Sequence, residues 1–220
     1  MNDSELFTTL RDRLFTAVVG DVMDRAGFRL QFLPPTVRPI TPEAVIVGRA
    51  MPVAVADVDH REVEADPFGL MFRALDELKP GEVYIAAGAS PTYALWGGLM
   101  SARAMQLGSP GAVLDGHHRD SREILRLGFP VFSHGGYAQD QRGRGRVADF
   151  RVPIVMANGV RVAPGDIVYG DIDGVLIVPA AEADDIVQAA LAKVEGERDV
   201  RHMIEAGETT EEIFERTGIM

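Results

Sequence analysis

Segments that favour strands alternate with segments that favour helices along this chain, and this alternation constrains its fold most. Strand patterns occupy 44–55, 79–88 and 111–115, and helical patterns lie between them at 67–78 and 97–107. Apolar residues in a continuous or alternating run indicate a strand, and a spacing of three to four residues indicates a helix. The mixture predicts an α/β or α+β domain.

Both ends of the chain favour helices. Leu6, Leu10 and Leu14 recur every four residues, and the next helical segment stops at Gly27. Near the C-terminus, one long helix carries an apolar stripe that consists of Ile186, Val187, Ala190, Leu191 and Val194. A last short helix begins near Thr209, with Thr209 and Glu212 as a capping box. These stripes need a surface to cover, either the chain's own core or a neighbouring subunit.

The segment 146–179 is rich in strand-forming residues and is interrupted by Asn158-Gly159, Pro164-Gly165 and Asp173-Gly174. Asn158-Gly159 is the strongest hairpin signal in the chain. We predict a single domain over 1–220, with a core of about 15–180 and C-terminal helices at about 180–218.

Composition excludes several classes of function. The chain has 220 residues and no cysteine, which excludes thiolate metal sites and leaves oxygen or imidazole ligands for a hard ion such as Mg²⁺ or Mn²⁺. The net charge of −11 disfavours nucleic acid as a partner. Without a signal-like N-terminus or a continuous apolar run of membrane-spanning length, the expected location is cytoplasmic and away from membranes.

The stretch WGGLMSARAMQLGSPGAVLDGHHRDSRE, at 96–123, carries the chemistry. Gly97 and Gly98 open the predicted helix, where backbone N–H groups have no partner inside the helix and attract anions. The N–H groups of Gly98, Leu99 and Met100 can therefore receive a carboxylate. Taken alone, the two glycines are more simply explained by a tight junction between loop and helix.

Arg119 offers a planar fork that fits a carboxylate or keto oxygen, and it lies between a strand and a helix, where sites of α/β proteins gather. Asp120 and Glu123 have two interpretations. They match an N-cap with a reciprocating acid three residues later. Alternatively, Asp120 binds a divalent cation, and Glu123, one turn later, reaches the same ion through water.

Other candidates are weaker. His117 and His118 are neighbours on an extended segment, so at most one of them is expected to face the site. Arg142, Arg144 and Arg146 alternate, which would make one side of an extended segment basic, suited to a second substrate carboxylate, to an acidic patch on a neighbour or to solvent.

Together these residues resemble the RraA-like family. Gly98, twenty intervening residues, Arg119-Asp120, two more and Glu123 reproduce its Gly-x20-Arg-Asp-x2-Glu/Asp pattern. Further matches are ALWGGLM, GAVLDGHHRD, PVFSHGGYAQDQRGRGRV and VAPGDIVYGDIDGVLIVP, so the resemblance runs from about 15 to 195. The family includes class II aldolases that act on 4-hydroxy-4-methyl-2-oxoglutarate and 4-carboxy-4-hydroxy-2-oxoadipate.

The resemblance implies a layered α/β/α sandwich with a swivelling-domain-like β core, assembled as a homotrimer or a dimer of trimers. It implies an Mg²⁺ or Mn²⁺ ion on Asp120 and backbone binding of a pyruvate-type carboxylate at Gly97, Gly98, Leu99 and Met100. Arg119 would contact the keto oxygen, and the metal and Arg119 would stabilise a pyruvate enolate. The implied substrate is a small 2-oxo acid.

One departure affects the chemistry. Authentic aldolases of the family have an acid where this chain has Gly98, and Glu123 is the candidate to replace its catalytic role. The expected activity is retro-aldol cleavage that releases pyruvate, or decarboxylation of oxaloacetate. The alternative is a non-catalytic regulator that acts by protein–protein binding, as the family's name-giving member does.

Overall fold

The structure, a computed structural model, describes residues 1–59 and 66–219. Its helices are α1 (Asp3–Arg13), α2 (Thr16–Arg25), α3 (Met71–Asp76), α4 (Gly98–Gln106), α5 (Ser121–Leu127), α6 (Ala183–Glu205) and α7 (Thr210–Thr217), with a 3₁₀ turn at Ala180–Glu182. Its strands are β1 (Arg38–Pro39), β2 (Ile46–Asp57), β3 (Glu82–Ala87), β4 (Ala94–Trp96), β5 (Ala112–Leu114), β6 (His117–His118), β7 (Val131–Ser133), β8 (Gly145–Phe150), β9 (Ile154–Val155), β10 (Arg161–Val162), β11 (Ile167–Asp171) and β12 (Gly174–Val178).

The main sheet is mixed and nearly closed. Its strand order is β1-β7-β5-β3-β2-β11-β12, and β8 also pairs with β2. Strands β2, β3, β5 and β7 are parallel, whereas β1, β8, β11 and β12 pair antiparallel. Leu33 N donates to Val175 O on β12, and a few residues later Arg38 pairs with Ser133 on β7. The segment between them therefore connects the two edges of the sheet.

Alternation along the parallel strands sends side chains to two different cores. On β3, Val83 and Ile85 are buried in the core that the curved sheet encloses, and Tyr84 and Ala86 belong to the core beneath the helices. A strand places successive side chains on opposite faces, so one strand serves both cores. The sheet is therefore buried on both sides at β3.

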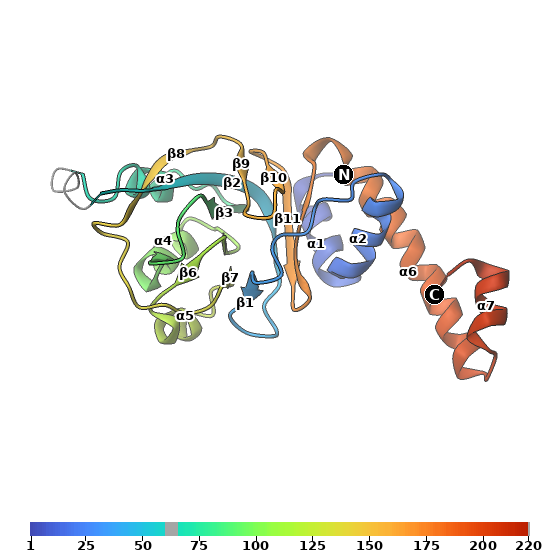
Figure 1. Cartoon of the computed structure of the whole chain (residues 1–220). Helices are drawn as coiled ribbons and strands as arrows, with labels where there is room; N and C mark the ends of the chain where they lie inside the picture. Colours follow the sequence, from blue (N-terminus) through green and yellow to red (C-terminus); the bar gives the residue numbers. More distant parts are fainter. Residues whose placement is uncertain (60–65, 220) are drawn as a thin grey trace.

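Helices cover the sheet on two sides. In Figure 1, α3, α4 and α5 lie at one end of the molecule, and α1, α2 and α6 lie on the other side of β11. Leu6, Leu10 and Val187 from the terminal stripes are buried against β11, β12 and each other. The chain's own core thus covers these stripes, as one of the two alternatives anticipated. The end of α6 and α7 project from the body.

The predicted mixed α/β fold with helices at both termini is confirmed. Residues Ile154–Val155 pair with Arg161–Val162 across Asn158-Gly159, as the hairpin signal predicted. The helix predicted at 67–78 is shorter, because Gly69 has a φ of 60° and its N–H donates to Asp66 Oδ1. This turn delays the start of α3 to Met71.

Candidate functional site

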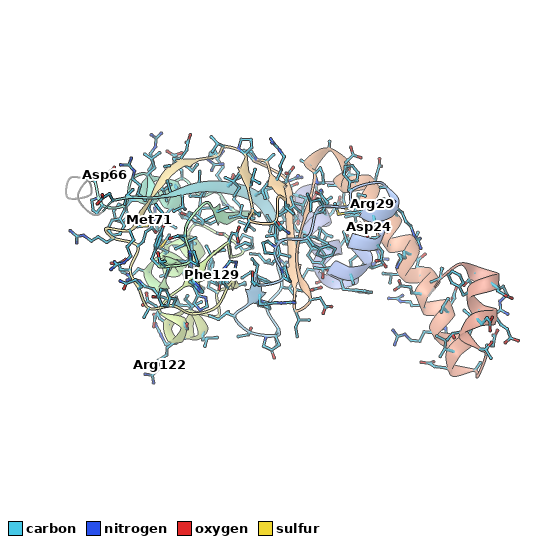
Figure 2. The ribbon with its side chains drawn as sticks, viewed as in Figure 1. Asp24, Arg29, Asp66, Met71, Arg122 and Phe129 are labelled. Atoms are coloured by element: carbon cyan, nitrogen blue, oxygen red, sulfur yellow. The ribbon has the colours of Figure 1, made fainter. Side chains whose placement is uncertain are left out.

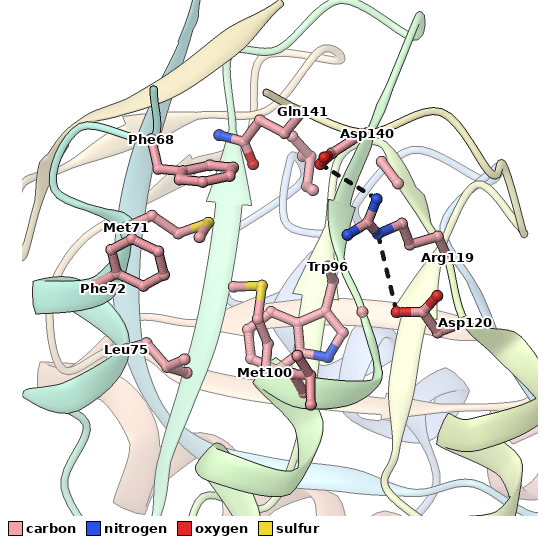
Figure 3. A pocket seen from close by; sticks show the side chains of 14 residues that line it. Phe68, Met71, Phe72, Leu75, Trp96, Met100, Arg119, Asp120, Asp140 and Gln141 are labelled. Atoms are coloured by element: carbon pink, nitrogen blue, oxygen red, sulfur yellow. Dashed lines mark ion pairs between the residues drawn. The ribbon is translucent and has the colours of Figure 1, made fainter. Parts of the chain in front are cut away.

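A cavity of about 250 Å³ lies at the N-terminus of α4 (Figure 3). Its lining comes from α3 and the turn before it, from β4 and the start of α4, and from the segments after β6 and before β8. The lining residues are Phe68, Met71, Phe72, Leu75, Ala94, Leu95, Trp96, Gly97, Leu99, Met100, Arg119, Asp120, Asp140 and Gln141. It therefore contains most of the residues that the sequence predicted for the site.

The short parallel strands β4 and β6 bring the two halves of the motif together. Ala94 and Trp96 pair with His117 and His118, and Arg119 N donates to Trp96 O at 2.8 Å. Consequently Gly97, the N-cap of α4, lies beside the Arg119-Asp120 pair despite the long sequence separation.

Buried hydrogen bonds fix the turn that leads into α4. Trp96 Nε1 donates to Ser101 Oγ at 2.7 Å, and that hydroxyl donates to Gly97 O at 3.1 Å. Trp96 also packs between Tyr84 and Phe129, at ring-centroid distances of 4.8 and 6.0 Å. The backbone amides at the start of α4 are thus held by a rigid support.

Asp120 occupies the N-cap position of α5, but its side chain does not cap that helix. It precedes α5 with a φ of 58°, and its side chain makes no capping hydrogen bond there. Instead, its Oδ2 accepts a hydrogen bond from Gly98 N at 3.1 Å. The N-cap interpretation of Asp120 is therefore wrong, because the left-handed backbone turns the carboxylate toward the neighbouring helix α4. A Cβ at Gly97 would lie 2.7 Å from Oδ2, so this approach requires a glycine.

One of the backbone N–H groups at the start of α4 is already hydrogen-bonded within the protein. Gly98 N–H is engaged by Asp120, whereas the N–H groups of Leu99 and Met100 have no acceptor among the residues described. The N–H groups of Leu99 and Met100 are therefore open to a ligand.

Arg119 lies between two carboxylates, as Figure 3 shows. Its Nη1 is 3.2 Å from Asp140 Oδ1, and its Nε is 3.9 Å from Asp120 Oδ2. The Arg119 side chain is 39% exposed, so its guanidinium reaches the cavity from a partly solvated position.

Glu123 is absent from the described cavity lining. Its carboxylate binds Arg126, with Oε2 2.9 Å from Nε, and this ion pair lowers the pKa of Glu123. Its stem lies beside Gly98, where a Cβ would be 2.8 Å from Glu123 Cγ. Glu123 thus fills the space that a larger residue at position 98 would need. Its predicted catalytic role stays a prediction.

Neither histidine lines the cavity. His118 is buried, with Nδ1 2.7 Å from Ser133 Oγ and Nε2 2.9 Å from Ser121 Oγ. Burial and the neighbouring His117 lower the pKa of His118, which favours a neutral structural role. The half-buried His117 packs near Tyr137, with ring centroids 5.4 Å apart. The two rings therefore separate, as the extended backbone predicted.

The arginines of the basic segment are all exposed, and Arg144 Nη1 donates to the backbone oxygens of Asp140 and Arg142. Arg142, Arg144 and Arg146 are absent from the described cavity lining. They stabilise or flank the loop that carries Asp140, and their proposed contact with a second carboxylate stays a prediction.

Sequence reasoning missed Asp140, Gln141 and the wall formed by α3. Asp140 and Gln141 directly precede the arginine repeat and carry no motif of their own. Helix α3 has an ordinary amphipathic pattern, and nothing in that pattern distinguishes a residue facing a cavity from one in the core. Figure 2 shows Met71 of this wall far from the exposed Asp24 on α2.

The oxygen atoms at the site suit a cation that keeps most of its water. Asp120 Oδ2 is anchored by Gly98 N–H, whereas Oδ1 has no hydrogen-bond partner within the described ranges. The side chain is 48% exposed, so a hydrated ion can approach it. No group of three or more His, Cys, Asp or Glu side chains in these ranges could hold a metal ion, so a cation here would depend on Asp120 and water. One carboxylate plus waters is a common arrangement for Mg²⁺.

The family model RraA-like, described as Aldolase/RraA, matches residues 16–177. The chain belongs to the RraA-like family. This RraA-like chain is 31% identical over 195 residues to a Halalkalibacterium halodurans protein named "Putative 4-hydroxy-4-methyl-2-oxoglutarate aldolase". The aligned region covers 88% of this chain and 86% of that relative.

Two solved structures resemble this RraA-like chain. A protein from Pseudomonas syringae pv. tomato matches with a TM-score of 0.84 and 26% identity, over 96% of this chain and 92% of its own. Streptomyces coelicolor RraAS2, described as an unusual member of the RNase ES inhibitor RraA protein family, matches in fold with a TM-score of 0.80 and 24% identity, over 91% of this chain and 97% of its own.

Among the helices of the described ranges, none combines the length and the apolar character that crossing a membrane requires.

Proposed function

We propose that this chain is a divalent-metal-dependent lyase that acts on small 2-oxo acids. The observation that supports this most is the convergence, in one cavity, of open α4 amides, the Arg119 guanidinium and the Asp120 carboxylate. The relative named as an aldolase agrees with this class of reaction. Asp120 would hold Mg²⁺ or Mn²⁺ through Oδ1, and the cation would supply positive charge that stabilises an enolate.

The residues of the chain have separate roles in this proposal. The N–H groups of Leu99 and Met100 bind the substrate carboxylate at the start of α4, where the helix dipole favours an anion. Arg119 donates to the C2 oxygen and stabilises the negative charge that develops there. Access of water to the enolate is limited by Trp96 and by the apolar lining residues Phe68, Met71, Phe72, Leu75 and Met100.

Two reactions share this enolate. In decarboxylation of oxaloacetate, the C3–C4 bond breaks, CO₂ leaves, and a proton added at C3 gives pyruvate. In retro-aldol cleavage, the same bond breaks, but the C4 hydroxyl must also lose a proton as it becomes a carbonyl. Asp140, a cavity carboxylate 3.2 Å from Arg119, is positioned to accept that proton.

The test is release of pyruvate from oxaloacetate with MgCl₂, with and without a chelator, above the rate of MgCl₂ alone. We expect chelation to abolish the enzymatic rate. We expect Arg119→Lys to reduce kcat by about 10²-fold, because a lysine ammonium cannot reproduce the planar guanidinium with its paired N–H donors. Arg126→Lys is the matched control, since Arg126 lies outside the cavity lining and pairs with Glu123. No pyruvate from oxaloacetate or from a panel of branched 2-oxo acids would favour the regulatory alternative.

A further inference from the structure

The two walls of the cavity differ in chemistry (Figure 3). Arg119, Asp120 and Asp140 form the polar wall, beside the α4 amides. Facing them is an apolar wall, which we define as Phe68, Met71, Phe72, Leu75 and Met100. A substrate whose 2-oxo acid end is bound at the polar wall would therefore place its other end among aromatic, thioether and aliphatic groups.

The charges in the lining disfavour a second carboxylate on the substrate. Among the described lining residues, Arg119 is the one cationic side chain, and it already pairs with Asp140. A carboxylate at the apolar wall would lose part of its hydration without gaining a cation, which is unfavourable. An aliphatic or aromatic group there would be stabilised by burial.

Gln141 supplies a neutral donor between the two walls. The residue is 4% exposed, and its buried Nε2 has no hydrogen-bond partner within the described residues. In Figure 3 its side chain lies between Phe68 and Asp140. A buried donor is unfavourable when unpaired, and a hydroxyl or carbonyl oxygen of a ligand would satisfy it.

We infer that the substrate class is a 4-hydroxy-2-oxo monocarboxylic acid whose C4 carries an apolar group. This inference rests on the proposed lyase function. The C3–C4 bond breaks, its electron pair forms the enolate of pyruvate, and the C4 hydroxyl proton passes to Asp140 and then to C3. The products are pyruvate and an apolar aldehyde, and the reaction consumes no other reactant. On substrate binding, the Gln141 amide must turn so that its solvent-shielded Nε2 reaches the C4 oxygen and donates to it.

The first test measures binding by calorimetry with MgCl₂ present. The probes are 5-methyl-2-oxohexanoate and 2-oxoglutarate, which have the same 2-oxo acid end and differ by an isopropyl group in place of a carboxylate. We expect the isopropyl compound to bind more tightly by about tenfold or more. Equal or tighter binding of 2-oxoglutarate overturns the inference, and so does failure of both to bind.

The second test measures pyruvate release from 4-hydroxy-5-methyl-2-oxohexanoate and 4-hydroxy-2-oxoglutarate. A higher kcat/KM for the first supports the inference, and a higher kcat/KM for the second overturns it but leaves the lyase function standing. If neither releases pyruvate while the binding preference holds, the lyase function fails and the specificity of the cavity stands.

Two variants test the walls separately. Phe72→Arg places a cation at the apolar wall, and we expect the preference to shift toward the dicarboxylates by about tenfold. Phe214→Arg is the matched control, because Phe214 on α7 is 55% exposed against 60% for Phe72 and lies outside the cavity lining. Gln141→Leu should lower kcat/KM for the hydroxylated substrate without changing the Kd of 5-methyl-2-oxohexanoate. Unchanged preference in Phe72→Arg contradicts the inference.

Discussion

Asp120 and Gly98 are joined by a hydrogen bond of 3.1 Å from the backbone N–H of Gly98 to Asp120 Oδ2. This bond connects the first residue of α4 with the residue that precedes α5. It orients one carboxylate oxygen and leaves the other toward solvent and the cavity. The same side chain can therefore support the fold and offer a ligand atom.

Replacement of Asp120 should separate these two roles. Asn can accept the Gly98 hydrogen bond and tolerates a φ of 58°, so we expect Asp120→Asn to change the free energy of unfolding by less than about 1 kcal/mol. Its metal-dependent pyruvate release should fall by about 10²-fold or more. Asp120→Ala should lose the activity as well and should reduce the free energy of unfolding by about 1–3 kcal/mol, because alanine adopts this backbone conformation poorly. Denaturant titration and the pyruvate assay measure the two effects, and full activity in Asp120→Asn would refute the ligand role.

The contact between Gly98 and Glu123 should appear as a thermodynamic coupling. A Cβ at position 98 would lie 2.8 Å from Glu123 Cγ, so we expect Gly98→Ala to destabilise the chain by about 1–3 kcal/mol. Glu123→Ala removes Cγ, the most crowded atom, but keeps Cβ at 3.1 Å, so the double variant should recover part of this loss. A double-mutant cycle by denaturant unfolding measures the coupling. Additive effects of the two substitutions would show that Glu123 does not occupy this space.

Asp140→Asn should distinguish the two lyase reactions. Aldol cleavage needs an acceptor for the C4 hydroxyl proton, and decarboxylation of oxaloacetate does not. We expect aldol kcat to fall by about 10²-fold or more, while the decarboxylation rate changes much less. Steady-state kinetics with both substrates provide the measurement. Equal losses in the two reactions would assign Asp140 to positioning of Arg119, its partner at 3.2 Å.

The ion pair between Glu82 and Arg151 should make stability depend on pH. Burial alone would raise the pKa of Glu82, but the hydrogen bonds from the Arg151 guanidinium and Lys79 N–H outweigh it and lower the pKa below its usual value of 4.5. Because the pKa of Glu82 is lower in the folded chain than in the unfolded chain, its ionised carboxylate stabilises the fold when the pH is above the unfolded-state pKa. This stabilisation is lost as the pH falls through the folded-state pKa.

We therefore expect Glu82→Gln to reduce the free energy of unfolding by about 2 kcal/mol near neutral pH. The difference from the unmodified chain should shrink as the pH falls below about 4.5, where the unfolded carboxyl takes up its proton. Chemical denaturation over a pH series gives both numbers. A difference that stays constant down to acid pH would mean that the charge of Glu82 contributes nothing.

Much of the fold could be predicted from local patterns. The alternation of strands and helices, the hairpin at Asn158-Gly159 and the end of α5 at Gly128 follow from periodicity and turn chemistry. The closure of the sheet by the segment between Leu33 and Arg38 could not be predicted, because it depends on pairing between residues more than 90 positions apart. Such long-range pairing leaves no local signal.

The site was predictable where backbone geometry determines it. Gly97, Arg119 and Asp120 converge as expected, because strand–helix junctions place them at the same edge. Asp-x-x-Glu, however, suggested a cap, and the left-handed conformation of Asp120 directs its side chain to α4 instead. Gln141 became a candidate only when its unpaired, buried amide was visible in the structure.

The most direct test of the proposed site is a crystal structure of the chain grown with MnCl₂ and pyruvate, with anomalous data collected for manganese. We predict an anomalous peak at coordination distance from Asp120 Oδ1, with the pyruvate carboxylate on the N–H groups of Leu99 and Met100. Pyruvate or manganese bound elsewhere, with Asp120 still joined only to Gly98 and no peak beside it, would contradict the proposal.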